Sequence, residues 1–257
     1  MRGLEQALLG KTIEAVRLNR SDLRFPFPEG FVERLTGQQI NGFSRRAKYM
    51  LWHLSSGCQA LMHLGMSGRF VLDSTIAPHD HVVFTIGGRE VRYNDPRRFG
   101  FMDLVEPSTP NRFLDPLGPE PLGNAFHGTY LYNQLRSRKS SIKACLLNQK
   151  IVVGVGNIYG SEALFRAKIR PQRIAANLTK AEAEALSTEV KAVLTEAIAA
   201  GGSSIRDYVQ ADGTLGYFQH TWNVYGREGK PCQICGNSIK RIVQSNRSSF
   251  YCRQCQV

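Results

Sequence analysis

Four cysteines near the C-terminus form the most specific chemical motif in the sequence. Two residues separate Cys232 from Cys235 and Cys252 from Cys255, and sixteen residues lie between the two pairs. This spacing lets both thiolates of a pair point to one centre, and two pairs complete a tetrahedral set of sulfurs. Disulfide bonds are the alternative, but the two remaining cysteines are isolated and nothing indicates an oxidising compartment. We therefore predict one Zn²⁺, which is structural because four thiolates leave no open position.

The residues between the two cysteine pairs predict a β-hairpin. Its strands are expected at residues 239–242 and 249–251, and its tip at residues 244–248. The zinc ion is expected to fold about thirty residues that have too little apolar core of their own. Arg247 and its polar neighbours at the tip are well suited to meet a phosphate.

The distribution of charge points to a nucleic acid. Lys and Arg total 33 against 21 Asp and Glu, a formal net charge of +12. Such a surplus favours solubility, but it also costs self-repulsion unless a polyanion or salt offsets it. Residues 128–174 hold nine basic side chains and one acid, and residues 226–257 hold six and one. Two separate basic blocks predict contacts with phosphates.

The elements that must position these residues differ between the two halves of the chain. The first half is expected to be mostly strands, with a hairpin at Gly87-Gly88 and further strands at 61–64 and 100–104. A short helix is expected to end before Gly10. Residues 106–123 contain five prolines and two glycines and therefore predict a domain boundary.

Helix-forming residues dominate after that boundary. A capping box at Thr179–Glu182 predicts a scaffold helix over residues 179–200. The glycine-containing segment 151–159 is expected to join a helix near 140–149 to another near 157–168. Glycines at the start of a helix let backbone N–H groups approach a phosphate, which suits the basic surroundings.

No segment approaches the ~20 apolar residues of a membrane span, and the N-terminus lacks a signal-peptide layout. The sequence therefore predicts a soluble cytoplasmic protein.

Five further motifs are specific in combination with the cysteine pairs. They are Arg45–Tyr49, His63–Gly68, Asp95–Gly100, Leu117–Leu122 and Gly154–Tyr159. With these motifs, the chain resembles the formamidopyrimidine-DNA glycosylase family from about residue 2 to residue 255. Members of this family are bacterial repair enzymes that excise oxidised purines, such as 8-oxoguanine and formamidopyrimidines, and then nick the DNA backbone at the abasic site.

The resemblance implies an α+β fold with three structured parts and a linker. The three parts are an N-terminal β-sandwich domain over residues 1–112, a helical domain with a helix–two-turn–helix over 128–222, and a zinc-finger β-hairpin over 223–257; the linker covers 113–127. It also implies a monomer that binds damaged double-stranded DNA in the bacterial cytoplasm, at the nucleoid.

The resemblance assigns roles to individual residues. Lys48 matches the lysine that assists β-elimination, and Arg247 matches the arginine of δ-elimination and phosphate binding. The implied DNA-binding residues are His79, Arg97, Arg138, Asn157, Met66, Phe99 and Lys143. Among them, Met66, Arg97 and Phe99 match the trio that fills the hole left by the everted base, as base extrusion requires. The loop Gln210–Phe218 matches the segment over the damaged base.

The start of the chain departs from the family pattern. The family begins Met-Pro-Glu-Leu-Pro-Glu; the proline amine attacks C1′ of the sugar and the glutamate handles protons. This chain begins Met1-Arg2-Gly3, which matches the family about nine residues further in, and its first proline is Pro26. Nucleophile and acid are therefore expected to be absent, either because the natural protein starts earlier or because the chain is truncated. Lys48 would be a better substitute amine than Met1, which is expected about 10 Å from the proline position.

Three functions therefore remain open. The chain is an active glycosylase and lyase for oxidised purines, a damaged-DNA-binding protein with impaired catalysis, or a member of the sister branch that acts on oxidised pyrimidines. As written, it is expected to bind abasic and oxidised DNA and to excise poorly or not at all. The Leu117–Leu122 motif and the long segment 203–218 favour the purine branch.

Overall fold

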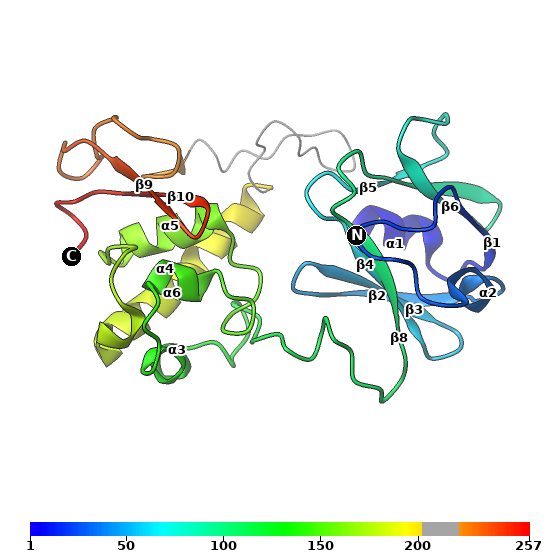
Figure 1. The fold of residues 1–257 in the computed structure, drawn as a ribbon, viewed down its shortest axis with the longest axis horizontal. Helices are drawn as coiled ribbons and strands as arrows, with labels where there is room; N and C mark the ends of the chain where they lie inside the picture. The colour runs from blue at the N-terminus through cyan, green and yellow to red at the C-terminus, as the bar shows by residue number, and fades with distance from the viewer. Residues whose placement is uncertain (202–220) are drawn as a thin grey trace. The chain divides into compact units, whose positions relative to one another are not determined.

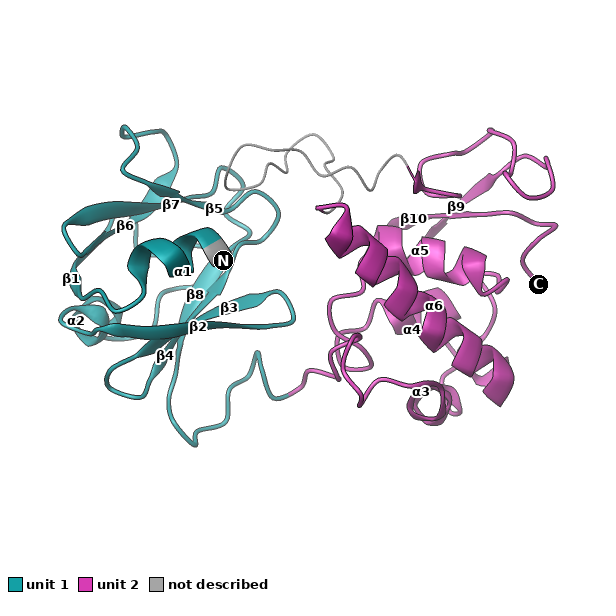
Figure 2. Ribbon diagram, turned by 180° about the vertical axis from the view of Figure 1, so that it is seen from behind, with its two compact units in different colours: residues 1–115 teal, residues 116–257 magenta. Residues whose placement is uncertain are grey.

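A computed structural model describes residues 1–201 and 221–257 of the chain (Figure 1). These residues form two compact units, 1–115 and 116–257 (Figure 2). The boundary lies within the proline-rich stretch 106–123, where the fixed φ of proline and its missing N–H interrupt regular structure. The loop Gln210–Phe218, expected over the damaged base, lies outside the described residues.

Two antiparallel four-stranded sheets make up most of the first unit. One sheet has the strand order β1 (Ile13–Leu18), β6 (Asp80–Ile86), β7 (Arg89–Asn94) and β5 (Arg69–Leu72). The other has the order β2 (Ile40–Arg46), β3 (Tyr49–Leu54), β4 (Gln59–His63) and β8 (Phe101–Val105). Two short helices, α1 (Arg2–Leu8) and α2 (Phe31–Leu35), accompany them. The helix end before Gly10 and the strands near 61–64 and 100–104 are confirmed within one or two residues.

Trp52 of β3 joins the two sheets. Its side chain is fully buried, and its ring centroid lies 5.3 Å from that of Phe84 and 5.4 Å from that of Phe70, both on the opposite sheet. Met50 and Leu54 enter the same core, because alternate residues of a strand face the same side. The N-terminal β-sandwich is thereby confirmed.

The hairpin between β6 and β7 is also confirmed. Gly87 and Gly88 form its two-residue turn with φ of +57° and +75°. Positive φ at both central residues is the requirement of a type I′ turn, which matches the twist of the flanking strands.

Helices form most of the second unit. They are α3 (Gly128–Leu135), α4 (Ile142–Leu146), α5 (Asn157–Arg166), the 3₁₀ turn η1 (Ala175–Asn177) and α6 (Lys180–Ala199). The predicted capping box is present, since Thr179 Oγ1 accepts from Glu182 N–H and the Glu182 carboxylate accepts from Thr179 N–H. Helices α3 and α5 pack against α6. No helix among the described residues is long and apolar enough to cross a membrane.

Helix α4 is shorter than the predicted helix near 140–149. The side chain of Asn148 accepts a hydrogen bond from Lys150 N–H, and its backbone carbonyl accepts from the N–H groups of Ile151 and Val152. These bonds close a turn in place of further helix, and the glycine-containing segment then leads into α5. The helix–two-turn–helix is confirmed with this earlier end of its first helix.

The predicted C-terminal hairpin is confirmed with a tighter tip. Strands β9 (Lys240–Gln244) and β10 (Arg247–Tyr251) pair from Gln244–Arg247 to Lys240–Tyr251. Only Ser245 and Asn246 form the turn, with φ of +48° and +59°. Arg247 is therefore the first residue of β10 and not part of a loose tip.

The position of Trp52 generates a prediction about stability. Trp52→Ala is expected to destabilise the first unit by about 3–5 kcal/mol, because it removes the ring that fills the space between the sheets. Hydrogen exchange read by mass spectrometry should show lost protection in residues 1–115 and unchanged protection in the helices of the second unit. Trp52→Phe keeps most of the apolar volume and should lose less. Equal loss of protection in both units would contradict the separate cores.

Candidate functional site

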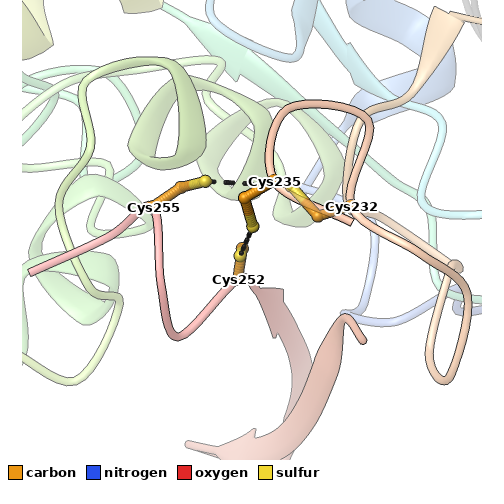
Figure 3. Close-up of side chains that lie close together, drawn as sticks. All are labelled: Cys232, Cys235, Cys252 and Cys255. Atoms are coloured by element: carbon orange, nitrogen blue, oxygen red, sulfur yellow. Dashed lines mark hydrogen bonds between the residues drawn. The ribbon is translucent and has the colours of Figure 1, made fainter. Parts of the chain in front are cut away.

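The four predicted metal ligands lie together in the second unit (Figure 3). Their sulfur atoms all lie within 4.8 Å of one another, with 3.4 Å between Cys235 and Cys252 and 3.9 Å between Cys232 and Cys255. Four tetrahedral sulfurs about 2.3 Å from a zinc ion are about 3.8 Å apart, so the cage has the right size. Disulfide-bonded sulfurs are about 2.05 Å apart, which rules out that alternative. The set fits one structural Zn²⁺.

Hydrogen bonds favour the metal-binding form of one of these thiols. The backbone hydrogen bond from Asn237 lowers the pKa of Cys235 to about 7. The side-chain amide of Asn237 lies 3.6 Å from the same sulfur. N–H groups that face sulfur stabilise the thiolate, which is the species that binds zinc.

The zinc-finger residues have only a small apolar core. It consists of Val224, Ile239, Phe250 and two of the cysteines, and it is completed by Phe165 of α5. A core of this size is too small to fold a segment alone, so zinc and the contact with α5 must supply the remainder.

Glu162 of α5 fixes the entry to the zinc finger. Its side chain is 1% exposed, and its carboxylate accepts hydrogen bonds from the backbone N–H groups of Asn223, Val224 and Tyr225 and from the Asn223 amide, at 2.8–3.0 Å. The sequence alone showed Glu162 only as the single acid of a basic block, and no sequence signal linked it to residues 223–225.

Strand β10 is anchored to α4 and α5 at Ser248. The carbonyl of Ser248 accepts from Asn157 Nδ2 at 2.9 Å and from Lys143 Nζ at 3.1 Å. Lys143 also donates to Ser249 Oγ at 2.8 Å and is 1% exposed. Burial, and then the charge of Arg247, lower the pKa of Lys143 to about 8. Lys143, expected among the DNA contacts, is therefore placed beneath the hairpin, where it holds the strand that carries Arg247.

Two predicted phosphate contacts of the second unit are exposed. Arg247 projects from the start of β10, and Arg138 follows the C-terminal end of α3, where its Nε donates to the carbonyl of Gln134 at 3.4 Å. Both guanidinium groups are thus available to solvent, unlike the ammonium of Lys143.

In the first unit, the carboxylate of Asp95 connects two loops. Asp95 is fully buried, and its Oδ1 accepts from Ser67 Oγ at 2.6 Å. Its Oδ2 accepts from Gly100 N–H at 2.9 Å and from Tyr93 Oη at 3.2 Å. Burial raises the pKa of Tyr93, and the charge of Asp95 raises it further, so the phenol remains a donor. In the sequence, Asp95 belongs to the motif Asp95–Gly100, and no local pattern indicates its role.

These two loops, 64–68 and 95–100, carry the predicted trio. Gly65 has φ of +66°, and a Cβ there would lie 2.5 Å from the backbone of Phe99 and Gly100, so the loops touch. The side chains of Met66 and Phe99 are 67% and 43% exposed, although both are apolar. Arg97 lies over the Phe99 ring, 4.7 Å from its centroid. The structure thus brings the trio together at the surface.

Lys48 lies near this region, and His79 lies on a neighbouring loop. Lys48 occupies the turn between β2 and β3 and is exposed. Burial lowers the pKa of His63, and the charges of Lys48 and Arg24 lower it further, which places both cations near this imidazole. His79 is exposed with φ of +73°, and its carbonyl accepts from Asp95 N–H at 3.1 Å.

The cysteine cage generates a prediction about metal content. Purified protein is expected to hold one zinc per chain, and Cys252→Ala is expected to abolish stoichiometric zinc and expose residues 223–257 to hydrogen exchange. Cys145→Ala changes a buried thiol outside the cage and should retain the metal. Metal analysis and exchange mass spectrometry provide the readouts. A zinc-free protein with a protected finger would refute the structural role.

Comparisons with known proteins agree with this arrangement. The family model for the formamidopyrimidine-DNA glycosylase N-terminal domain matches residues 1–102, and that for the H2TH domain of the same enzyme matches residues 117–209. The model of a zinc finger found in FPG and IleRS matches residues 229–257.

Individual relatives match along nearly the whole chain. A formamidopyrimidine-DNA glycosylase from Cereibacter sphaeroides is 54% identical over 99% of this chain and 96% of its own length, and one from Bartonella henselae is 50% identical with the same coverage. The crystal structure of the MutM (Fpg) protein from Thermus thermophilus superposes with a TM-score of 0.89 at 39% identity, covering 99% of this chain and 95% of the other. A complex between Lactococcus lactis Fpg and abasic-site DNA gives 0.89 at 32% identity, covering 99% and 96%. The chain belongs to the formamidopyrimidine-DNA glycosylase family.

Proposed function

We propose that this protein is a base-excision repair glycosylase with abasic-site lyase activity that removes 8-oxoguanine and formamidopyrimidines from duplex DNA. Membership of the family supports the reaction class. The observation that carries the proposal for this chain is the exposed trio of Met66, Arg97 and Phe99 on two loops tied together by a buried carboxylate.

The trio is suited to replace an everted base. An enzyme that acts at C1′ must extrude the nucleotide, which costs a few kcal/mol of lost stacking and pairing. Met66 and Phe99 offer apolar surface, and Arg97 offers a planar donor stacked on Phe99. Because Asp95 holds both loops, these side chains occupy the hole without first being ordered.

Phosphate contacts supply most of the affinity in this proposal. Arg247, Arg138 and His79 are exposed, and Asn157 lies at the start of α5, where backbone N–H groups favour an anion. Asn157 and Lys143 also hold β10 in place, so their loss would displace Arg247 as well. The zinc finger serves the same purpose, since zinc and Glu162 set the base of the hairpin.

After base loss, the abasic sugar is cleaved by elimination. In β-elimination a base removes a proton from C2′ and the C3′–O bond breaks, which releases the 3′ phosphate. We assign assistance of this step to Lys48, and assistance of the following δ-elimination, which releases the 5′ phosphate, to Arg247. In this proposal, residues 1–112 form the catalytic domain, residues 128–222 form the helix–two-turn–helix domain that binds the duplex, and residues 223–257 form the zinc-finger hairpin. The protein acts as a monomer on chromosomal DNA in the cytoplasm.

Excision is tested on duplexes with one 8-oxoguanine, one oxidised pyrimidine, or normal bases only. Because the resemblance assigns the attacking amine to the opening segment of the family, the assay uses a longer form of the protein that begins with the first residues of the Cereibacter sphaeroides relative. The longer form should cut the 8-oxoguanine duplex faster than the duplex with normal bases by several orders of magnitude, and it should be trapped on the 8-oxoguanine duplex by borohydride. Preference for the oxidised pyrimidine would assign the sister branch. If the longer form cuts no lesion, the proposal fails.

Lys48→Ala, made in the longer form, is expected to slow strand cleavage about 100-fold, the usual loss when a proton-transfer group is removed. Binding to a duplex with a stable abasic analogue should change much less. Lys11→Ala, at another exposed lysine of the first unit, is the matched control and should cleave normally. Equal cleavage by both variants would remove Lys48 from the mechanism.

Asp95→Asn tests the shared carboxylate. An amide of the same shape has one accepting oxygen, so at least one of the three donors to Asp95 loses its acceptor. Hydrogen bonds to a charged group contribute about 1.5–3 kcal/mol, so we expect roughly 10- to 100-fold weaker lesion recognition. Base extrusion, followed with 2-aminopurine beside the lesion, should fall while binding to undamaged duplex is kept. Asp73→Asn, an exposed carboxylate, is the control; unchanged extrusion in Asp95→Asn would argue against the tie between the loops.

A further inference from the structure

A second apolar cluster covers the outer face of the sheet β2-β3-β4-β8. Leu51, Leu61 and Phe101 point away from the sandwich core, since their strand neighbours point into it. Phe101 is the centre of the cluster. Its ring centroid lies 4.5 Å from that of Phe113, 5.0 Å from that of His63, 5.1 Å from that of Phe25 and 6.0 Å from that of Tyr49.

Two arginines cover the aromatic rings that close this cluster. The guanidinium of Arg24 lies 5.5 Å from the centroid of Phe25. That of Arg112 lies 5.6 Å from the same ring and 4.6 Å from Phe113. Both arginines are exposed, although residues 20–25 and 111–115 are far apart in the sequence.

The backbones that carry these arginines are held in place. Arg24 N–H donates to the carbonyl of Gly100 at 3.1 Å, at the end of the loop that bears Phe99. Asn111 Oδ1 accepts from the N–H groups of Phe113 and Leu114 at 2.9 and 3.2 Å. The stacked guanidinium groups therefore have limited freedom, which lowers the entropy lost when they bind a ligand.

The carboxylates nearest to the two arginines in the sequence have other hydrogen-bond partners. Asp22, the acid nearest to Arg24 in the sequence, pairs with Arg20, and Asp115 accepts from Asn111 N–H. Neither Arg24 nor Arg112 forms a salt bridge within the described residues. Stacking on a ring leaves the edge of a guanidinium, with its N–H donors, open to an anion.

The aromatic cluster also brings Lys48 to the same place. Tyr49 follows Lys48 and contacts both Phe101 and His63. Burial raises the pKa of Tyr49, and the charge of Arg24 lowers it in part. Burial lowers the pKa of His63, and the charges of Lys48 and Arg24 lower it further. Three cations thus lie around one aromatic cluster, and their mutual repulsion favours a polyanion in contact with them.

We propose that Arg24 and Arg112 bind backbone phosphates of duplex DNA at the aromatic cluster beside Lys48. The proposal rests on the proposed function, which makes damaged DNA the polyanion. It adds a phosphate-binding pair in the first unit to the basic blocks at 128–174 and 226–257. The aromatic rings hold the guanidinium groups in place, and the N–H edges bind the phosphate oxygens.

The test removes the charge and keeps the side-chain stems. The variant Arg24→Gln/Arg112→Gln is compared with Lys11→Gln/Arg17→Gln, which removes the same charge from exposed residues at and before β1, in the other sheet. Binding to an abasic-analogue duplex is measured over a range of salt concentrations. Two lost phosphate contacts should reduce the slope of log K against log salt by about 1.8 and weaken binding roughly tenfold or more at low salt. The control variant should keep the slope of the unaltered chain.

The lysine, glutamine and control variants decide the proposal. Arg24→Lys/Arg112→Lys should restore most of the slope, because an ammonium still binds a phosphate. A glutamine variant with the slope of the unaltered chain would overturn the phosphate contact, and so would an equal loss in the control variant. If instead the unaltered chain binds the abasic duplex no better than undamaged DNA, the proposed function fails and not this pair. Thermal unfolding of all variants identifies a loss of fold, in which case the lysine variant alone decides.

Discussion

The buried carboxylate of Asp95 is the interaction on which the first unit's working surface depends. Burying a carboxylate is costly unless its oxygens are hydrogen-bonded, and here three donors satisfy it: Ser67 from the other loop, and Tyr93 and Gly100 from either side of Asp95 in the sequence. Because the buried charge needs all three hydrogen bonds, separating the two loops would cost free energy. That constraint lets Met66 and Phe99 remain exposed, against the usual tendency of apolar side chains to be buried. The same loop end accepts Arg24 N–H through the Gly100 carbonyl, so the proposed phosphate pair depends on this carboxylate as well.

The second unit uses buried charges in the same way. The Glu162 carboxylate accepts hydrogen bonds from the backbone N–H groups at the start of the zinc finger. Lys143 donates to the strand that carries Arg247. The zinc ion adds the third fixed point by closing the cage of four sulfurs. The hairpin has little core of its own, so its position relative to α5 rests on these polar anchors more than on hydrophobic burial. In both units, the exposed groups proposed to bind DNA are therefore held in place by buried, hydrogen-bonded groups.

The arginines of the chain differ in whether carboxylates neutralise them. A net charge of +12 spread evenly would serve solubility and little else. Here, Arg166, Arg173 and Arg20 pair with carboxylates, whereas Arg24, Arg112, Arg138 and Arg247 make no salt bridge within the described residues. Of these four, Arg24 and Arg112 lie over aromatic rings. In the proposed complex, Arg24 and Arg112 therefore combine charge for a phosphate with a geometry that the rings limit beforehand.

Local chemistry let the sequence alone determine several features. Two-residue spacing brings each pair of cysteine thiolates together, the Thr179–Glu182 box starts α6, and two glycines make the β6–β7 turn, all through contacts between near neighbours. The motifs also identified the family and, with it, the sandwich and the helix–two-turn–helix. What only the tertiary structure decided depends on contacts between distant segments. Ser67 and Asp95 are 28 residues apart, and Lys143 and Ser249 are 106 apart. No local pattern distinguishes a buried, bonded Lys143 from an exposed phosphate contact, or places Arg24 and Arg112 over one ring. Those roles are set by desolvation and by the partners that the fold supplies, and neither exists until the chain has folded.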